Sequence, residues 1–129
     1  MPCWSWFVCV ISGPPHSLIS TVGKALLIAE EIELDNVGVN MDTGHALMGF
    51  ENLAESAVLL HRYKRLFYLH LNDNYRDWDY DMIVGGVHIW ETLELLYWLN
   101  KLGYDGWYTL DLILIEKTLF RHAFRVSKT

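Results

Sequence analysis

The sequence has little of what several classes of protein require. It contains two cysteines, Cys3 and Cys9, which are too few for a disulfide framework and lack the spacing of a structural zinc site. The apolar run from Trp4 to Ile11 is too short to span a bilayer, and the first basic residue is Lys24, so no positive charge precedes that run. We therefore expect a cytoplasmic protein with no signal peptide and no membrane span.

Basic side chains are also scarce. The 129 residues include 10 Lys and Arg against 16 Asp and Glu, for a formal net charge of −6. Proteins that bind nucleic acid need clustered Lys and Arg to neutralise phosphates, so nucleic acid is not an expected partner. Val84 to Val87 is too short for a glycine-rich phosphate loop, so no dinucleotide is expected either. In contrast, 52% of the residues are hydrophobic, which predicts a packed core.

Apolar segments of strand length alternate with segments of helical periodicity. Ser17 is the expected N-cap of the first helix, and Gly103 is the expected residue after the last one. The predicted strands are 4–11, 37–41, 66–71 and 107–115, and the predicted helices are 18–33, 51–63 and 90–102. This alternation predicts an α/β fold with a parallel sheet. No linker divides the chain, so we expect a single domain over 1–129.

Three consecutive predicted strands carry a side chain that can bind a metal ion. Asp42 follows the second strand, His70 lies near the end of the third, and Asp111 interrupts the fourth. The C-terminal ends of parallel strands face one side, so these side chains can converge. Carboxylates with an imidazole suit Mg²⁺, Mn²⁺ or Co²⁺.

Each residue also has a purely structural explanation. Asp42 can be a turn or helix cap, and His70 can be a core histidine whose hydrogen bonds are satisfied. Asp111 is harder to explain, because a buried carboxylate without a partner is costly. His45 lies three residues after Asp42 in a glycine-containing loop. The loop after the third strand is either a solvated acidic loop or a source of further ligands, and it carries Asp73, Asp77, Asp79 and Asp81.

Four sequence strings resemble the xylose isomerase-like TIM-barrel superfamily of sugar isomerases and epimerases. They are DTGH at 42–45, HLNDN at 70–74, DWDYD at 77–81 followed by Gly85 and Gly86, and LGYDGWYTLD at 102–111. Their order and spacing match over about 17–111. The combination of Asp42, His70 and Asp111 is most similar to the rhamnose isomerase-like branch. The resemblance implies a partial (β/α)₈ TIM barrel of about four βα units, equivalent to the C-terminal half of the barrel.

The resemblance also implies roles for the candidate residues. Asp42, His70 and Asp111 would hold a structural divalent ion, and His45, Asp79 and Asp81 would hold a second ion with its activated water. Asp81 rather than Asp77 is chosen because it lies four residues before Gly85. The implied reaction is aldose–ketose isomerisation of a sugar by hydride transfer, whereas related epimerases move a proton between two glutamates with one metal ion.

The two ends of the chain depart from the family pattern. Trp6 to Pro15 contains neither Glu nor Lys, so the family's first metal-binding glutamate is absent, and 112–129 lacks the usual proline-rich and aromatic turn. A half barrel would expose two sheet edges and an apolar inner face, which favours a homo-oligomer or a partner half-barrel. The alternatives are therefore an active isomerase and a non-catalytic half-barrel remnant or assembly module. An endonuclease of the same superfamily is disfavoured by the acidic charge.

Other aromatic and histidine side chains have structural explanations. Trp78 and Trp90 can line a sugar pocket, but we expect Trp90 in the helix core. His88 is expected to be structural or exposed, although its place after the Gly-Gly pair allows contact with substrate. Cys3 and Cys9 have even spacing and are expected to share a buried strand face.

Overall fold

The described part of the computed structural model covers residues 17–112 and contains three strands and four helices. The predicted strand at 4–11, both cysteines and the tail from residue 113 onward lie outside the described residues. In chain order the elements are α1 (Val22–Glu31), β1 (Val39–Asp42), α2 (Thr43–Met48), α3 (Leu53–Arg62), β2 (Leu66–Leu71), α4 (Ile89–Leu102) and β3 (Trp107–Leu110).

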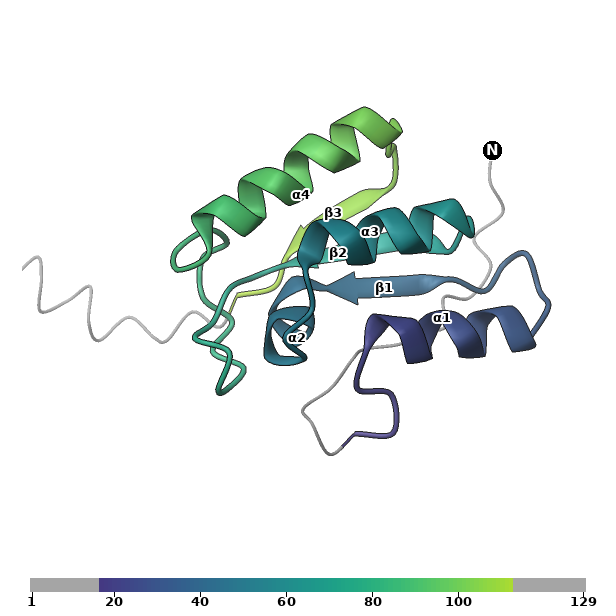
Figure 1. Ribbon diagram of the computed structural model, residues 1–129, viewed down its shortest axis with the longest axis horizontal. Coiled ribbons are helices and arrows are strands. Elements are labelled where there is room, and N and C mark those ends of the chain that lie inside the picture. Colours follow the sequence, from purple (N-terminus) through teal and green to yellow (C-terminus); the bar gives the residue numbers. More distant parts are fainter. Residues whose placement is uncertain (1–16, 113–129) are drawn as a thin grey trace, which may run out of the picture.

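The three strands form one parallel sheet in the order β1-β2-β3. Helices α1, α3 and α4 lie along this sheet, with α3 between α1 and α4 (Figure 1). Helices lie between β1 and β2 and between β2 and β3, and they return the chain to the amino end of the sheet, as parallel pairing requires. This confirms the expected α/β fold with a parallel sheet, and its strand–helix alternation matches that expected for part of a (β/α)₈ barrel.

The core lies between the strands and the helices. It is made of side chains that are at most 8% exposed, with Leu69 of β2 completely buried at its centre. The other members come mostly from the four helices, β1 and β2, and include Ala29, Met41, Leu60, Leu95 and Leu99. Burial of this apolar surface is the main force that holds the helices against the sheet.

Helix α1 begins later than the apolar pattern predicts. The N-cap is Thr21, whose side chain accepts a hydrogen bond from the backbone N–H of Lys24, rather than Ser17. Ser17 instead donates to the carbonyl of Ile19, and Leu18 is 89% exposed, so the first turn expected at 18 does not form. The helix stops before Glu33, which has a left-handed backbone with φ of 54°.

The residues after Asp42 form helix α2, where the sequence pattern indicated a loop. The Asp42 carboxylate caps this helix by accepting a hydrogen bond of 3.0 Å from the His45 backbone N–H. The helix has only six residues, which is too few to show a helical repeat of apolar positions. Asp42 is thus the helix cap that one interpretation proposed, and it still has a second carboxylate oxygen available.

The last two elements confirm one prediction and correct two. Gly103 ends α4 with a left-handed φ of 67°, as expected. Trp90 is not in the helix core, because the buried side of α4 carries Thr92, Leu95 and Leu99 and leaves Trp90 78% exposed. Strand β3 ends at Leu110, so Asp111 follows the strand instead of interrupting it.

Within residues 17–112, no helix is long and apolar enough to cross a membrane.

Truncation of the central core residue should destabilise the fold. We expect Leu69→Ala to lower the free energy of unfolding by about 2–5 kcal/mol, because it leaves a cavity where Leu69 is fully buried. Urea denaturation followed by circular dichroism measures this loss. The matched control is Leu27→Ala on α1, where the side chain is 60% exposed and the change should stay within about 0.5 kcal/mol. Equal effects of the two substitutions would contradict the described core.

Candidate metal centre

Asp42, His70 and Asp111 meet at the carboxyl edge of the sheet. Asp42 pairs directly with His70 across β1 and β2, and Asp111 follows β3 with its backbone N–H bonded to the carbonyl of Leu71 at 3.2 Å. His70 Nδ1 lies 3.1 Å from Asp111 Oδ2 and 3.6 Å from Asp42 Oδ2. One ligand atom from each residue lies within 4.8 Å of the other two, which is a spacing that one divalent ion can bridge.

This group is buried at one side and open at the other. The Asp42 side chain is 3% exposed, that of His70 is 23% exposed, and that of Asp111 is 49% exposed. The expectation of a buried Asp111 carboxylate is therefore wrong, because the residue lies beyond the strand end, where solvent reaches it. A ligand can approach the group from the Asp111 side.

Burial raises the pKa of Asp42 above its ordinary value. The nearby His45 lowers the pKa through its charge and its backbone N–H, and Asp79 raises it further, with desolvation as the largest cause. The ionised carboxylate is thus under electrostatic strain. A bound cation would relieve that strain, because opposite charge favours the ionised form.

A second pair joins α2 to the loop between β2 and α4. His45 Nε2 lies 2.7 Å from Asp79 Oδ2, and their side chains are 13% and 31% exposed. Among the described residues, His45 Nδ1 and Asp79 Oδ1 are buried and have no hydrogen-bond partner. Buried polar atoms normally have a partner. These two atoms therefore suit a ligand site.

Asp81 interacts electrostatically with one member of each group, Asp111 in the first and Asp79 in the second. Its carboxylate accepts a hydrogen bond of 3.1 Å from the side chain of Asn72. Burial and the negative charges of Asp79 and Asp111 raise its pKa. Asp77 instead accepts a hydrogen bond of 3.4 Å from the hydroxyl of Tyr80. The loop thus places Asp79 and Asp81 toward the acidic edge.

Two asparagines that sequence reasoning did not single out lock α2 to this loop. The Asn72 side-chain oxygen accepts from the backbone N–H of Gly44 and from the hydroxyl of Thr43. Asn74 donates to the carbonyl of Gly44 at 2.8 Å. A Cβ on Gly44 would lie 2.5 Å from the Asn72 oxygen, so only glycine fits. The sequence signal for this role is the pair of asparagines, at 72 and 74, within three residues of the end of an apolar strand.

One residue of this loop, Asp73, differs from the interpretation of the loop as solvated and acidic. Asp73 is 1% exposed, and its Oδ1 lies 2.7 Å from His88 Nδ1, within hydrogen-bond distance, so it is not a solvated loop carboxylate. Trp78 is 64% exposed. His88 has the structural role that was expected of it, through this contact with Asp73.

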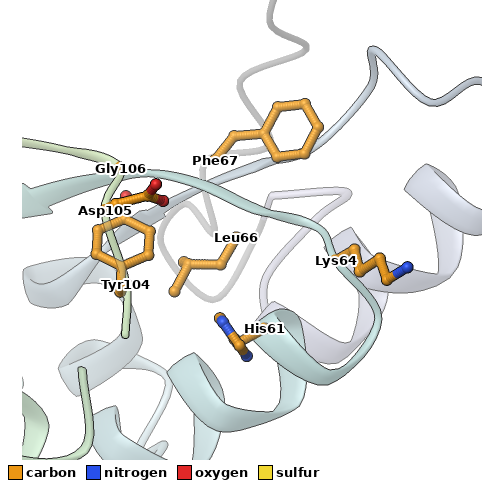
Figure 2. A pocket seen from close by; sticks show the side chains of 7 residues that line it. All are labelled: His61, Lys64, Leu66, Phe67, Tyr104, Asp105 and Gly106. Atoms are coloured by element: carbon orange, nitrogen blue, oxygen red, sulfur yellow. The ribbon is translucent and has the colours of Figure 1, made fainter. Parts of the chain in front are cut away.

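A hollow in the described surface lies at the amino ends of β2 and β3. It has a volume of about 560 Å³, and Figure 2 shows the residues that line it: His61, Lys64, Leu66, Phe67, Tyr104, Asp105 and Gly106. Leu66 begins β2, whereas His70 lies near its end, about 13 Å further along the strand. The hollow is therefore separate from the candidate metal ligands, which lie at the carboxyl ends of the strands.

The raised pKa of Asp42 predicts how stability depends on pH in the absence of divalent ions. An acid with a raised folded pKa reduces stability fully at pH values above that pKa, and this penalty disappears as the pH falls below its ordinary pKa of 3.8. We expect Asp42→Asn to raise the urea midpoint at pH 7, because Asn keeps the helix cap without the charge. The gain should vanish near pH 4.

The matched control is Asp42→Ala, which removes both the charge and the cap of α2. It should be less stable than Asp42→Asn by about 1 kcal/mol at every pH. A pH-independent gain in Asp42→Asn would show that the charge is not the cause.

The comparisons with known proteins agree with this architecture. No curated protein matches the sequence. The family model for the xylose isomerase-like TIM barrel matches residues 3–128, a span that includes all four strings noted in the sequence and extends beyond them at both ends. Since the match covers nearly the whole chain, this protein belongs to the xylose isomerase-like TIM-barrel family, which includes sugar isomerases and epimerases.

Proposed function

We propose that this chain is a divalent-metal-dependent sugar isomerase, equivalent to the C-terminal half of a barrel of the rhamnose isomerase-like branch. The observation that carries the proposal is the convergence of Asp42, His70 and Asp111 within 4.8 Å at the carboxyl edge of the sheet. Active sites of TIM barrels lie at this edge. Family membership supports the substrate class, because the family includes sugar isomerases and epimerases.

The donor set fits one or two hard divalent ions such as Mn²⁺, Mg²⁺ or Co²⁺. Asp42, His70 and Asp111 would hold the first ion. His45, Asp79 and Asp81 would hold the second, and the two buried atoms without a partner, on His45 and Asp79, support this assignment. Such ions polarise the oxygens of a bound sugar and orient it.

The residues of the chain would supply positioning and charge. The His45 backbone N–H fixes one oxygen of Asp42 at 3.0 Å and leaves the other directed toward His70. Next to this group, the Tyr68 hydroxyl contacts the hydroxyl of Thr109, so polar groups continue along the sheet toward its centre. These groups can hold sugar hydroxyls beside the metal ligands.

Charge balance supports binding even without the family's first glutamate. Residues 6–15 contain no Glu, but four aspartates, at 42, 79, 81 and 111, interact electrostatically at this edge. Their four negative charges can balance two divalent cations. The absent glutamate therefore does not by itself exclude a bound metal.

A calorimetric titration with Mn²⁺ at neutral pH tests the site. We expect binding in the micromolar range, and we expect His70→Ala to weaken it by at least about 100-fold, because a ligand is lost rather than an outer residue. The matched control is His61→Ala. His61 lies on α3 and lines the hollow at the amino ends of the strands, so this variant should bind Mn²⁺ like the unchanged protein. Absence of binding by the unchanged protein would overturn the proposal.

The activity itself is tested by incubating the Mn²⁺- or Co²⁺-loaded protein with a panel of aldoses and measuring ketose formation. Turnover that Asp42→Ala abolishes would support isomerisation. Metal binding without turnover on any aldose would overturn the isomerase proposal while leaving the metal site in place.

A second candidate function is a non-catalytic assembly module that pairs with another copy of the chain. Exposed apolar side chains favour it: Trp90, Leu93 and Tyr97 of α4 are 78%, 47% and 59% exposed, and Tyr108 and Leu110 of β3 are 45% and 60% exposed. Within residues 17–112, β3 pairs only with β2, so its other edge is open. An apolar surface beside an open strand edge is a site for association with another chain.

Sedimentation velocity tests self-association. We expect a dimer or larger species at micromolar concentration, and we expect the double substitution Leu93→Lys and Tyr97→Lys to shift it to monomer, because charges would be buried in the interface. Leu27→Lys on α1, at a side chain that is 60% exposed, is the matched control and should leave the assembly unchanged. A monomeric unchanged protein would exclude this function.

A further inference from the structure

Asp73 connects the two ends of the loop that carries Asp79 and Asp81. Its carboxylate accepts hydrogen bonds from the backbone N–H groups of Asn74, Val87 and His88, at 2.8, 2.8 and 2.9 Å. Its backbone pairs with Met82 through two hydrogen bonds, at 2.9 and 3.0 Å. One buried residue thus binds the beginning, the middle and the end of the loop.

His88 and Arg76 complete this arrangement. His88 Nδ1 lies 2.7 Å from Asp73 Oδ1, and Arg76 Nε donates to His88 Nε2 at 3.1 Å. Because a guanidinium can only donate, Nε2 must accept and Nδ1 must carry the proton that is donated to Asp73. The contacts therefore fix His88 as one neutral tautomer between an anion and a cation.

The protonation state of Asp73 agrees with this order of donors. Burial would raise its pKa, but hydrogen bonds from the His88 ring and from three backbone N–H groups outweigh burial and hold the pKa below its ordinary value. The ionised carboxylate also lies at the beginning of α4, where the helix dipole stabilises negative charge.

Arg76 extends the arrangement to the neighbouring helices. Its guanidinium lies 3.5 Å from the carboxylate of Glu91 on α4 and 3.5 Å from the carbonyl of Leu47 on α2. It also lies 5.9 Å from the centre of the Phe50 ring. Arg76 therefore ties the loop to both α2, which carries His45, and α4.

Apolar burial contributes little to holding the tip of this loop. Tyr75, Trp78 and Tyr80 are 60%, 64% and 38% exposed. Polar contacts must therefore set where Asp79 and Asp81 lie.

We propose that Asp73, His88 and Arg76 form a positioning triad that fixes the loop so that Asp79 faces His45 and Asp81 faces Asn72. None of the three is assigned as a metal ligand. The inference rests on the proposed function in one respect, since the triad would control occupancy of the second ion only. Binding of an ion by Asp42, His70 and Asp111 would not depend on the triad.

Amide hydrogen exchange on the metal-free full-length protein tests the triad without any ion. We expect His88→Ala to speed exchange at Asn74, Met82 and Val87 by at least about fivefold, because their hydrogen-bond acceptor is released. His88→Asn should restore protection, since its amide nitrogen can donate to Asp73 where Nδ1 does. His61→Ala is the control and should change none of these amides. Unchanged exchange in His88→Ala would overturn the triad.

Mn²⁺ stoichiometry by calorimetry tests the consequence. We expect two ions in the unchanged protein, and in His88→Ala one ion of unchanged affinity and a second weakened about 10–100-fold. Arg76→Lys, which keeps the charge but not the Nε donor, should produce a smaller loss in the same direction and serves if His88→Ala does not fold.

The outcomes separate this inference from the proposed function. Two ions of normal affinity in His88→Ala, or equal loss of both ions, would overturn selective positioning. Fewer than two ions in the unchanged protein would instead overturn the two-ion part of the proposed function, and the exchange rates of the metal-free protein would still decide whether the triad fixes the loop.

Discussion

The parallel register of β1, β2 and β3 is the constraint on which the rest of the structure depends. It sets Asp42 opposite His70 and places Asp111 one residue beyond the pair of Leu71 and Leu110. A shift of one residue in any strand would turn these side chains to the helix-covered face. The buried apolar face fixes the register, so the core of the protein also determines the geometry of its polar edge. Stability and site geometry are therefore not separable in this fold.

Polar side chains then fix the positions of candidate ligands that do not lie on strands. Asn72 and Asn74 join the loop after β2 to α2 through Gly44, and the chain cannot carry a side chain at that glycine. This arrangement brings His45, on a helix, to Asp79, on a loop, although the two are 34 residues apart. Burial raises the pKa values of Asp42 and Asp81, and the neighbouring carboxylates at this edge raise them further. Such electrostatic strain is typical of functional sites.

Strands and long helices could be predicted from the periodicity of apolar residues. Features that depend on a single short element or a single contact could not. The strand at 66–71 and the end of α4 at Gly103 follow from local apolar pattern and backbone preference. Helix α2 is too short for a pattern, and the cap at Thr21 depends on one hydrogen bond that competes with other local options. The exposure of Trp90 depends on which side of α4 meets the sheet. The apolar residues on both sides of that helix made this ambiguous.

The candidate ligands were found because strand ends are visible in the sequence, whereas the residues that orient them were not. Asp73 looks like any acid in a polar loop, and its burial arises from contacts with Val87 and His88, which lie 14 and 15 residues later. No local rule connects such positions. The resemblance of four short strings to a known family supplied the order of the ligands but not the network that holds them.

The order of the strands in space is the same as their order along the chain, and this has a consequence for how the protein forms. Each new strand pairs with the one synthesised just before it, and α4 packs against α3, which is already present. Each described strand pairs with its neighbour in sequence order, so the entropy lost in closing each loop is modest. During synthesis, β1 with α3 and β2 can dock before α4 and β3 leave the ribosome, and the growing sheet exposes one advancing edge at a time.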